Sequence, residues 1–251
     1  MPLTLTPLQN IPIIQPGDDL TAIIQSTFKP SNIQLSIGDV IVIAQKIVSK
    51  AEGRMVHLAT VTPSLAAQKL ATKINKDPRL TELILRESKA VLRTRPGLMI
   101  VEHRLGFICA NAGIDQSNVA GSEDWALLLP ENPDKSAAEI RARLEATNNQ
   151  HIGVMIIDSH GRAWRTGTVG ITIGLSGLPG LVDLRGNHDL SGYTLKNTVI
   201  AVADELAAAA SLIMGQAAEG TPVIHVRGFP YPLRESSLKE LLRPEEQDLF
   251  R

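Results

Sequence analysis

Two short apolar runs limit what this chain can fold into. VIVIA at 40–44 and GVMII at 153–157 are apolar along their whole length, with no alternation of polar residues. A strand with this pattern is buried on both of its faces. The runs therefore predict two buried strands, and a polar, functionally suggestive segment follows each of them.

The segments around these runs mix helical and strand patterns. Helical spacing with capping residues predicts five helices, at 17–28, 62–74, 77–88, 135–149 and 197–215. Further strands are predicted at 3–8, 98–110, 169–177 and 221–228. Asp18 or Asp19 caps the first helix, Thr62 caps the second, and Gly106 marks a tight hairpin turn within 98–110. We therefore expect a mixed α/β (α+β) fold with mixed sheets and hairpins, and neither a Rossmann fold nor a TIM barrel.

Composition excludes several classes of protein. The 251 residues are 43% hydrophobic but 3% aromatic, so Val, Ile, Leu and Ala must fill the core. Basic and acidic residues balance at 25 and 26, which argues against nucleic acid or an anionic membrane as partner. The single Cys109 excludes an internal disulfide and is expected to be a small buried hydrophobe. A signal peptide and a membrane span are not evident, so we expect a cytoplasmic protein.

The stretch IIDSHGRAWRTG at 156–167 places Asp158, Ser159 and His160 in a row. Neighbouring residues of an extended segment point to opposite faces, so these three cannot form a hydrolase triad. We expect a strand that ends in a loop, with Asp158 at its carboxyl end. Asp158 and Ser159 then suit Mg²⁺ or Mn²⁺, while Arg162 and Arg165 suit an anionic substrate. A turn aspartate and surface arginines remain the alternatives.

Three other stretches carry related chemistry. NAGIDQSNV offers Asp115 and Asn118 in a loop, and QKIVSKAEG places Lys46 and Lys50 four apart, on one face if that segment is helical. MGQAAEGT at 214–221 has small residues that let a ligand approach the backbone. Ordinary loop residues, a basic surface and a helix cap at Gly215 are the alternatives. Together the stretches indicate a metal-assisted enzyme acting on a phosphorylated compound.

The order of the motifs is more specific than any one of them. IPIIQPGDDL, SKAEGR, NAGIDQSNV, DSHGRAWRTGTVGITIG, DLRGNHDLSG, VADELAAAASLIMG and PVIHVRG resemble, in this order, the coenzyme F420-0:L-glutamate ligase family. The resemblance covers nearly the whole chain. It implies a GTP-dependent ligase that joins L-glutamate to the lactyl carboxylate of the coenzyme precursor and then adds γ-linked glutamates. GDP and phosphate leave, and an acyl phosphate is the expected intermediate.

The resemblance also implies an architecture and partners. We expect a two-lobed fold, with residues 1–90 and 190–251 as a nucleotide-binding lobe and 91–189 as an inserted metal and substrate lobe. A homodimer, one or two Mg²⁺ or Mn²⁺ ions, and K⁺ as a further cation are also expected. The small molecules GTP, L-glutamate and F420-0 are the expected partners.

Site residues are implied by position in the same way. Asp115, Asp158 and Lys50 are the predicted catalytic residues, and Arg162 and Arg165 are predicted to bind substrate. The predicted metal ligands are Asp115 and Asp158 for one ion and Ser159 and Gln216 for a second. The predicted nucleotide contacts are Ile11, Pro12, Ile13, Ile14, Gln45, Lys46, Lys50, Asn118, Met214, Gly215, Gln216, Ala217, Ala218, Glu219, Gly220 and Thr221.

Departures from the family pattern keep other functions open. Gln216 stands where the family favours glutamate, which removes one negative charge from the second metal site, and the loop GQAAEG has alanines where glycines are usual. Gln45–Lys46 also replaces a small hydroxyl pair. A ligase or phosphotransferase acting on another phosphorylated acid, or a non-catalytic nucleotide-binding relative, are therefore the alternatives.

Overall fold

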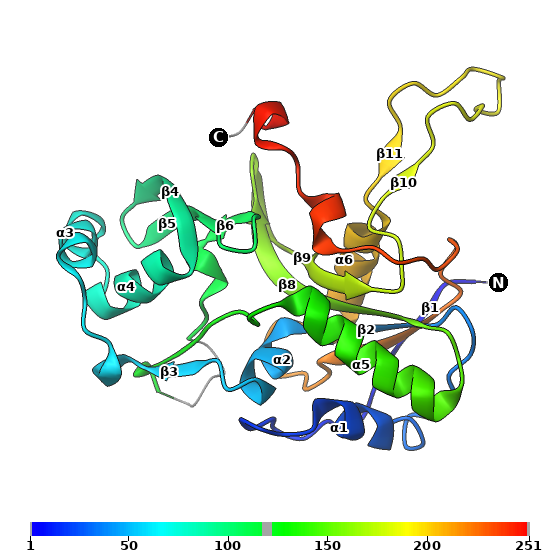
Figure 1. The fold of residues 1–251 in the computed structure, drawn as a ribbon, viewed down its shortest axis with the longest axis horizontal. Helices are drawn as coiled ribbons and strands as arrows, with labels where there is room; N and C mark the ends of the chain where they lie inside the picture. The colour runs from blue at the N-terminus through cyan, green and yellow to red at the C-terminus, as the bar shows by residue number, and fades with distance from the viewer. Residues whose placement is uncertain (1, 117–121, 250–251) are drawn as a thin grey trace.

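The computed structural model describes residues 2–116 and 122–249, which form a larger and a smaller lobe side by side (Figure 1). Five strands form the main sheet of the larger lobe, in the order β1-β12-β2-β8-β9. Their bounds are β1 Thr4–Pro7, β2 Val40–Ala44, β8 Gly153–Arg162, β9 Arg165–Ser176 and β12 Val223–Arg227. β2 and β8 run parallel, and the other neighbouring pairs are antiparallel. The two apolar runs form buried strands, as the sequence predicts, and the structure shows that these strands, β2 and β8, are neighbours in the sheet.

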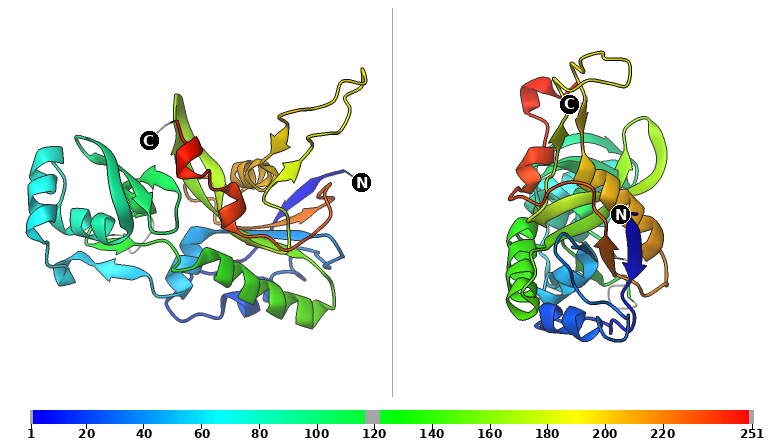
Figure 2. Two further views of the ribbon diagram at one scale, coloured as in Figure 1. Left: turned by 45° about the horizontal axis from the view of Figure 1, so that its top comes forward. Right: turned by 90° about the vertical axis from the view of Figure 1, so that its right-hand side faces the viewer.

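Helices cover both faces of this sheet (Figure 2). α6, Val202–Met214, packs on one face against β9, and α5, Pro133–Asn148, packs on the other against β8 and β9. α1, Leu20–Ser26, lies against α5, and α2, Gln45–Ala51, follows β2 directly. The sheet is therefore enclosed on both sides, which explains why its central strands carry no polar alternation.

A β-bulge in β9 places residues of this one strand against the helices on both faces of the sheet. Ile156 pairs with Gly174 but Ile157 pairs with Thr172, so Ile173 is an extra residue. Gly170 faces α6, whereas Gly174 faces the start of α5. Residues four apart on a regular strand share a face, and the bulge reverses this between Gly170 and Gly174.

Gly174→Ala is expected to destabilise the protein by about 1–3 kcal/mol, because a new Cβ would overlap the backbone and ring of Pro133. Urea unfolding followed by circular dichroism measures this change. Gly161→Ala is the matched control, since its Cβ would meet nothing within 4 Å. Equal stability of the two variants would show that α5 does not approach β9 this closely.

The smaller lobe is an insertion between α2 and α5. Its described residues form the helices α3 Leu65–Ile74 and α4 Pro78–Arg86 and the short 3-10 helices η1 Leu58–Thr60 and η2 Asn111–Gly113. Its strands are β3 Met55–His57 paired with β7 Trp125–Leu127, and a sheet of β4 Ser88–Arg95, β5 Leu98–His103 and β6 Ile108–Ala110. β5 and β6 form the hairpin predicted around Gly106.

This arrangement differs from the division expected at residues 90 and 190. β8 and β9 fall within the predicted inserted segment 91–189, yet they belong to the same sheet as β1, β2 and β12. Conversely, β3, α3 and α4 precede residue 90 but pack in the smaller lobe. The pairing of β2 with β8 joins segments more than a hundred residues apart, and a local sequence pattern carries no record of such a pairing.

An arm and a tail complete the larger lobe. β10 Val182–Asp183 and β11 Val199–Ile200 form the base of an arm that projects away from both lobes (Figure 1). The tail has two helical turns, η3 Leu238–Leu241 and η4 Glu245–Gln247, which Pro244 separates. Within residues 2–116 and 122–249, each helix is too short or too polar to cross a membrane.

Helix caps follow the sequence in one case and differ in another. Asp19 caps α1 as expected, because its carboxylate accepts the N–H of Ala22 at 3.0 Å. The predicted cap Thr62 is wrong for α3, which Ser64 caps instead. Glu82 of α4 accepts the N–H of Ser64 at 2.9 Å, and this tertiary contact holds Ser64 at the start of the helix.

Candidate active site

β2 ends at one edge of the main sheet, beside the parallel strand β8, which continues beyond that edge. Ala44, the last residue of β2, is opposite Ile157 in β8. Gln45 therefore follows β2 directly as the start of α2, and Asp158 is the first residue of β8 beyond the end of β2. In α/β sheets this edge is where ligands bind.

Two further segments reach the same edge because their strands run the other way. β12 is antiparallel to β2, and the loop before it joins the edge where Ala44 donates its N–H to the Pro222 carbonyl at 2.8 Å. The segment after β1 arrives there too, since Leu8 donates its N–H to the Val223 carbonyl at 2.9 Å. The predicted nucleotide segments at 11–14, 45–50 and 214–221 thus converge.

The segment at 11–14 continues from this edge toward α2. Ile14 is buried, whereas the side chain of Ile13 is 80% exposed. Gly17 donates its N–H to the Ala51 carbonyl at 2.9 Å, so the segment lies against the end of α2. An exposed apolar side chain held on an ordered segment gives a ligand a surface to pack against.

α2 presents its two lysines toward the smaller lobe. Lys46 Nζ lies 2.7 Å from Asp115 Oδ2, and this ion pair joins the lobes. Lys50 is 9% exposed. Burial and the positive charge of Lys46 lower the pKa of the Lys50 ammonium, and the negative charge of Asp115 opposes this shift. Gln45 is buried and accepts the Ser49 hydroxyl at 2.8 Å. The helix confirms that both lysines share a face, as their spacing predicts.

β8 does not end at Asp158, so the predicted strand-end loop is wrong. The ladder with β9 continues past the core, pairing Asp158 with Ile171 and His160 with Val169. Both strands then run into a hairpin whose turn lies between Arg162 and Arg165. The local sequence is polar and rich in glycine, but hydrogen bonds to β9 extend the strand.

Alternation along β8 separates the three residues that resembled a triad. Asp158 and His160 share a face, with 2.9 Å between His160 Nε2 and Asp158 Oδ2. Ser159 faces the other way and donates its hydroxyl to Gln216 Oε1 at 2.8 Å. Gln216 Nε2 in turn donates to the Ser211 hydroxyl of α6 at 2.9 Å. The exclusion of a triad is confirmed, and Ser159 and Gln216 are in contact, as a shared role requires.

His160 is a site residue to which the sequence analysis assigned no role. Its side chain is 6% exposed and packs against the smaller lobe, where its ring centroid lies 5.3 Å from that of Phe107. The two-residue spacing of Asp158 and His160 was the available signal, because i and i+2 share a face of a strand. The prediction of a loop after Asp158 gave no reason to apply this spacing.

The loop at 214–221 closes on itself. Gly215 ends α6 with a φ of 72°, as the predicted cap, and Thr221 donates its hydroxyl to the Met214 carbonyl at 3.1 Å. Glu219 folds back and accepts the Ala217 N–H at 2.8 Å. Backbone N–H groups, that of Ala217 first, lower the pKa of the Glu219 carboxyl. Backbone N–H groups of this loop therefore already bind the carboxylate of Glu219.

The two arginines flank the tip of the β8–β9 hairpin. Arg162 and Arg165 are both exposed, and Trp164 between them is 88% exposed. Arg162 lines an open groove of about 610 Å³ along α6, together with Asp204 and Glu205. The arginines lie beyond Asp158 along the ribbon, so they can contact parts of a substrate remote from the carboxylates.

The predicted metal ligands have the right chemistry but are not gathered into one cluster. Asp115, Asp158, Ser159 and Gln216 all offer oxygen, which Mg²⁺ and Mn²⁺ prefer. In the described part of the chain, no three His, Cys, Asp or Glu side chains lie together as a metal site. A cation at Asp115 would compete with the Lys46 ammonium, which now neutralises that carboxylate. The donor set therefore matches divalent cations in its chemistry, but Asp158 and Ser159 are directed to different sides of β8.

Asn118 lies outside the described residues. Cys109 is buried as expected, and burial, with the charge of Asp158 adding to it, raises the pKa of its thiol to about 12. Cys109 therefore remains a protonated, apolar neighbour of the site.

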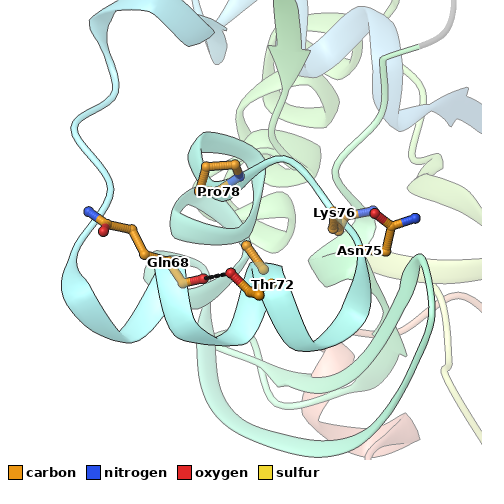
Figure 3. Close-up of a pocket in the computed structure, with 6 residues that line it drawn as sticks. Gln68, Thr72, Asn75, Lys76 and Pro78 are labelled. Carbon is orange, nitrogen blue, oxygen red and sulfur yellow. Dashed lines mark hydrogen bonds between the residues drawn. The ribbon is translucent and has the colours of Figure 1, made fainter.

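A second groove, of about 310 Å³, lies between α3 and the start of α4 (Figure 3). Gln68, Thr72 and Asn75 contribute amide and hydroxyl groups to it. Lys76 Nζ already donates to the Gly97 carbonyl at 3.1 Å. The described lining offers no pair of carboxylates for a divalent cation, so this groove is a weaker candidate than the sheet edge.

Comparison with known proteins agrees with the motif order. Residues 9–228 match the family model described as F420-0:Gamma-glutamyl ligase. The coenzyme F420:L-glutamate ligase of Methanothermobacter thermautotrophicus is 44% identical over 253 residues, covering 100% of both chains. The ligase of the same name from Methanopyrus kandleri is 43% identical, and the match covers 95% of this chain and 93% of that protein. The one from Archaeoglobus fulgidus is 40% identical, and the match covers 100% of this chain and 97% of that protein. This chain therefore belongs to the F420-0:gamma-glutamyl ligase family.

Proposed function

We propose that this protein is a GTP-dependent ligase that joins L-glutamate to the lactyl carboxylate of coenzyme F420-0 and then adds further γ-linked glutamates. The observation that carries the proposal is the convergence of three predicted nucleotide segments beside Asp158 at one sheet edge. Such an edge offers backbone N–H groups, ammonium groups and carboxylates together, which are the groups that hold a nucleoside triphosphate.

The reaction needs an activated carboxylate, because an oxide is a poor leaving group. A lactyl carboxylate oxygen attacks the γ-phosphorus of GTP, the bond to the β–γ bridging oxygen breaks, and GDP leaves. The glutamate amine then attacks the acyl carbon of the acyl phosphate. The C–O bond breaks, phosphate leaves with its electron pair, and the amine nitrogen loses a proton.

The chain's own residues supply positioning and charge for these steps. Lys50, with Lys46 beside it on α2, offsets the negative charge on the transferred phosphoryl group. A divalent cation held by Asp115 and Asp158 would neutralise phosphate oxygens, and Ser159 and Gln216 are the proposed donors for a second ion. We assign Arg162 and Arg165 to anionic groups of the substrates, because both are exposed on the hairpin beyond Asp158.

We also propose a homodimer, which the family resemblance implies. The β10–β11 arm is the surface we assign to it. Leu190 and Tyr193 are exposed on this arm, and it extends away from the body of the protein (Figure 1).

The proposal is tested with purified protein, F420-0, L-glutamate, GTP and Mg²⁺ or Mn²⁺. Mass spectrometry is expected to show F420-0 extended by one or more glutamyl units, with one GDP formed for each unit. GDP formed with another acid as acceptor, but not with F420-0, would favour a different ligase or phosphotransferase. Thermal stabilisation by GTP with no GDP formed would favour a non-catalytic nucleotide-binding protein.

A further inference from the structure

A buried histidine stands beside the Asp158 carboxylate, and the mechanism above does not use it. His160 Nε2 lies 2.9 Å from Asp158 Oδ2, but its N–H direction misses that oxygen, so the contact is not an aligned hydrogen bond. Within the described residues, Nε2 therefore makes no hydrogen bond. A buried donor without an aligned partner costs about 1–3 kcal/mol, so packing alone is a poor reason for a histidine here.

The smaller lobe fixes the His160 ring in place. Phe107, in the β5–β6 hairpin, lies against it and stacks in parallel on His103, with 5.1 Å between ring centroids and an interplanar angle of 5°. His103 is fully buried, and its Nδ1 accepts the Leu105 N–H at 3.0 Å. Three rings therefore form a contiguous row that ends at the Asp158 carboxylate, with Phe107 stacked on His103 and tilted by 55° against His160.

The far end of this row of rings, at His103, is anchored where the chain crosses between the lobes. Glu87 Oε2 lies 3.7 Å from His103 Nε2 and accepts hydrogen bonds from Arg54 at 3.0 Å and Arg104 at 2.9 Å. Arg54 also donates to the Leu129 carbonyl at 2.9 Å, which joins the outgoing and returning segments of the chain. Through Glu87 and Arg54, the row of rings therefore contacts both chain segments that connect the lobes.

We propose that His160 is a positioning residue for Asp158: when a divalent cation takes one oxygen of the carboxylate, the Nε2 N–H of His160, already 2.9 Å from Oδ2, becomes the donor that holds the other oxygen. Phe107 and His103 keep the imidazole in place, which makes the smaller lobe part of the carboxylate's geometry. This inference rests on the proposed function, which assigns Asp158 as a cation ligand.

The expected size of the effect follows from similar arrangements. Groups that hydrogen-bond to metal ligands change metal affinity by about 10–100-fold when they are removed. Leucine in place of His160 keeps the bulk but removes the donor, whereas glutamine places an amide N–H at a similar reach. A positioning role therefore predicts a loss in His160→Leu and a partial recovery in His160→Gln.

The test measures binding of Mn²⁺ alone to the full chain by electron paramagnetic resonance, with the melting temperature of each variant recorded beside it. His160→Leu is expected to weaken Mn²⁺ binding at the Asp158 site by about 10-fold or more, and Asp158→Ala is expected to abolish it. His160→Gln should recover part of the loss. His188→Leu is the control for adventitious binding by an exposed imidazole, and it should bind as the parent does.

The variants separate failure of this inference from failure of the proposed function. Unchanged Mn²⁺ affinity in His160→Leu, with a loss in Asp158→Ala, would overturn the positioning role and keep the metal assignment. Unchanged affinity in both variants, or a parent that binds no Mn²⁺, would overturn the metal assignment and this inference with it. Loss in His160→Leu without recovery in His160→Gln, accompanied by a matching drop in melting temperature, would mark a merely structural histidine.

Discussion

Asp158→Asn is expected to lower ligase turnover by about 10³-fold or more while the protein remains folded. The substitution keeps the size of the side chain but removes the charge that we assign to cation binding. Charge stabilisation by a bound metal is worth several kcal/mol in the transition state, and about 4 kcal/mol corresponds to a 10³-fold change in rate. Steady-state GDP release in the presence of F420-0 and glutamate measures the effect.

The matched control for this carboxylate-to-amide change is Glu139→Gln on α5. Glu139 is 66% exposed and lies 3.7 Å from Lys135, so its loss should leave turnover unchanged. Far-ultraviolet circular dichroism and the melting temperature establish that both variants are folded. Parent-like turnover in folded Asp158→Asn would remove Asp158 from the proposed site.

Asp39→Ala is expected to cost about 3 kcal/mol of folding stability and to lower the melting temperature by roughly 10 °C. Asp39 is 1% exposed at the start of β2 and accepts hydrogen bonds from three partners. These are His225 at 2.8 Å, Arg227 at 2.7 Å and the Ser36 N–H at 2.8 Å. Removing the carboxylate leaves these donors without their acceptor at the sheet end opposite the site, so stability should fall.

Asp183→Ala is the informative control for Asp39. Arg185 lowers the pKa of the Asp183 carboxyl to about 2. The pKa of the Asp39 carboxyl is also about 2, because hydrogen bonds from His225 and Arg227 outweigh the effect of burial, which raises it. Asp183, however, is exposed on the arm, where solvent screens the pair, so its removal should leave the melting temperature unchanged. Equal losses in the two variants would contradict the view that burial decides the contribution.

The Asp39 contribution also has a defined pH window. The carboxyl has a pKa of about 2 in the folded protein and 3.8 as its ordinary value. Its stabilisation is therefore fully present above pH 3.8 and is lost as the pH falls through 2. Urea unfolding at pH 5, 4 and 3 should show the difference between parent and Asp39→Ala narrowing toward acid. A constant difference would show that ionisation of Asp39 is not the source of the effect.

Local patterns predicted those features that depend on a few consecutive residues. VIVIA and GVMII are buried strands because a run without polar alternation has no face to turn toward water. Gly215 ends α6 for a reason confined to backbone geometry at that position. The exclusion of a triad at 158–160 also held, because opposite directions of neighbouring side chains are a property of any extended segment.

Features that depend on pairing between distant segments were predicted less well. The glycine-rich sequence after Asp158 is typical of a loop, but β9 extends β8 through it by hydrogen bonding. The partition of the lobes differed for the same reason, since β2 and β8 meet across the insertion. The ion pair between Lys46 and Asp115 likewise joins two lobes whose contact has no local signal.

The sequence by itself determined the class of fold, the family and the chemical types present at the site, because these follow from residue identity and short-range spacing. The tertiary structure decided which of those groups meet. It brought three distant loops to one edge of the sheet, turned Ser159 toward Gln216, and enclosed His160 between Asp158 and Phe107. The physical reason is that strand pairing and lobe contact bring together residues far apart in the chain, and each such contact depends on the fold as a whole.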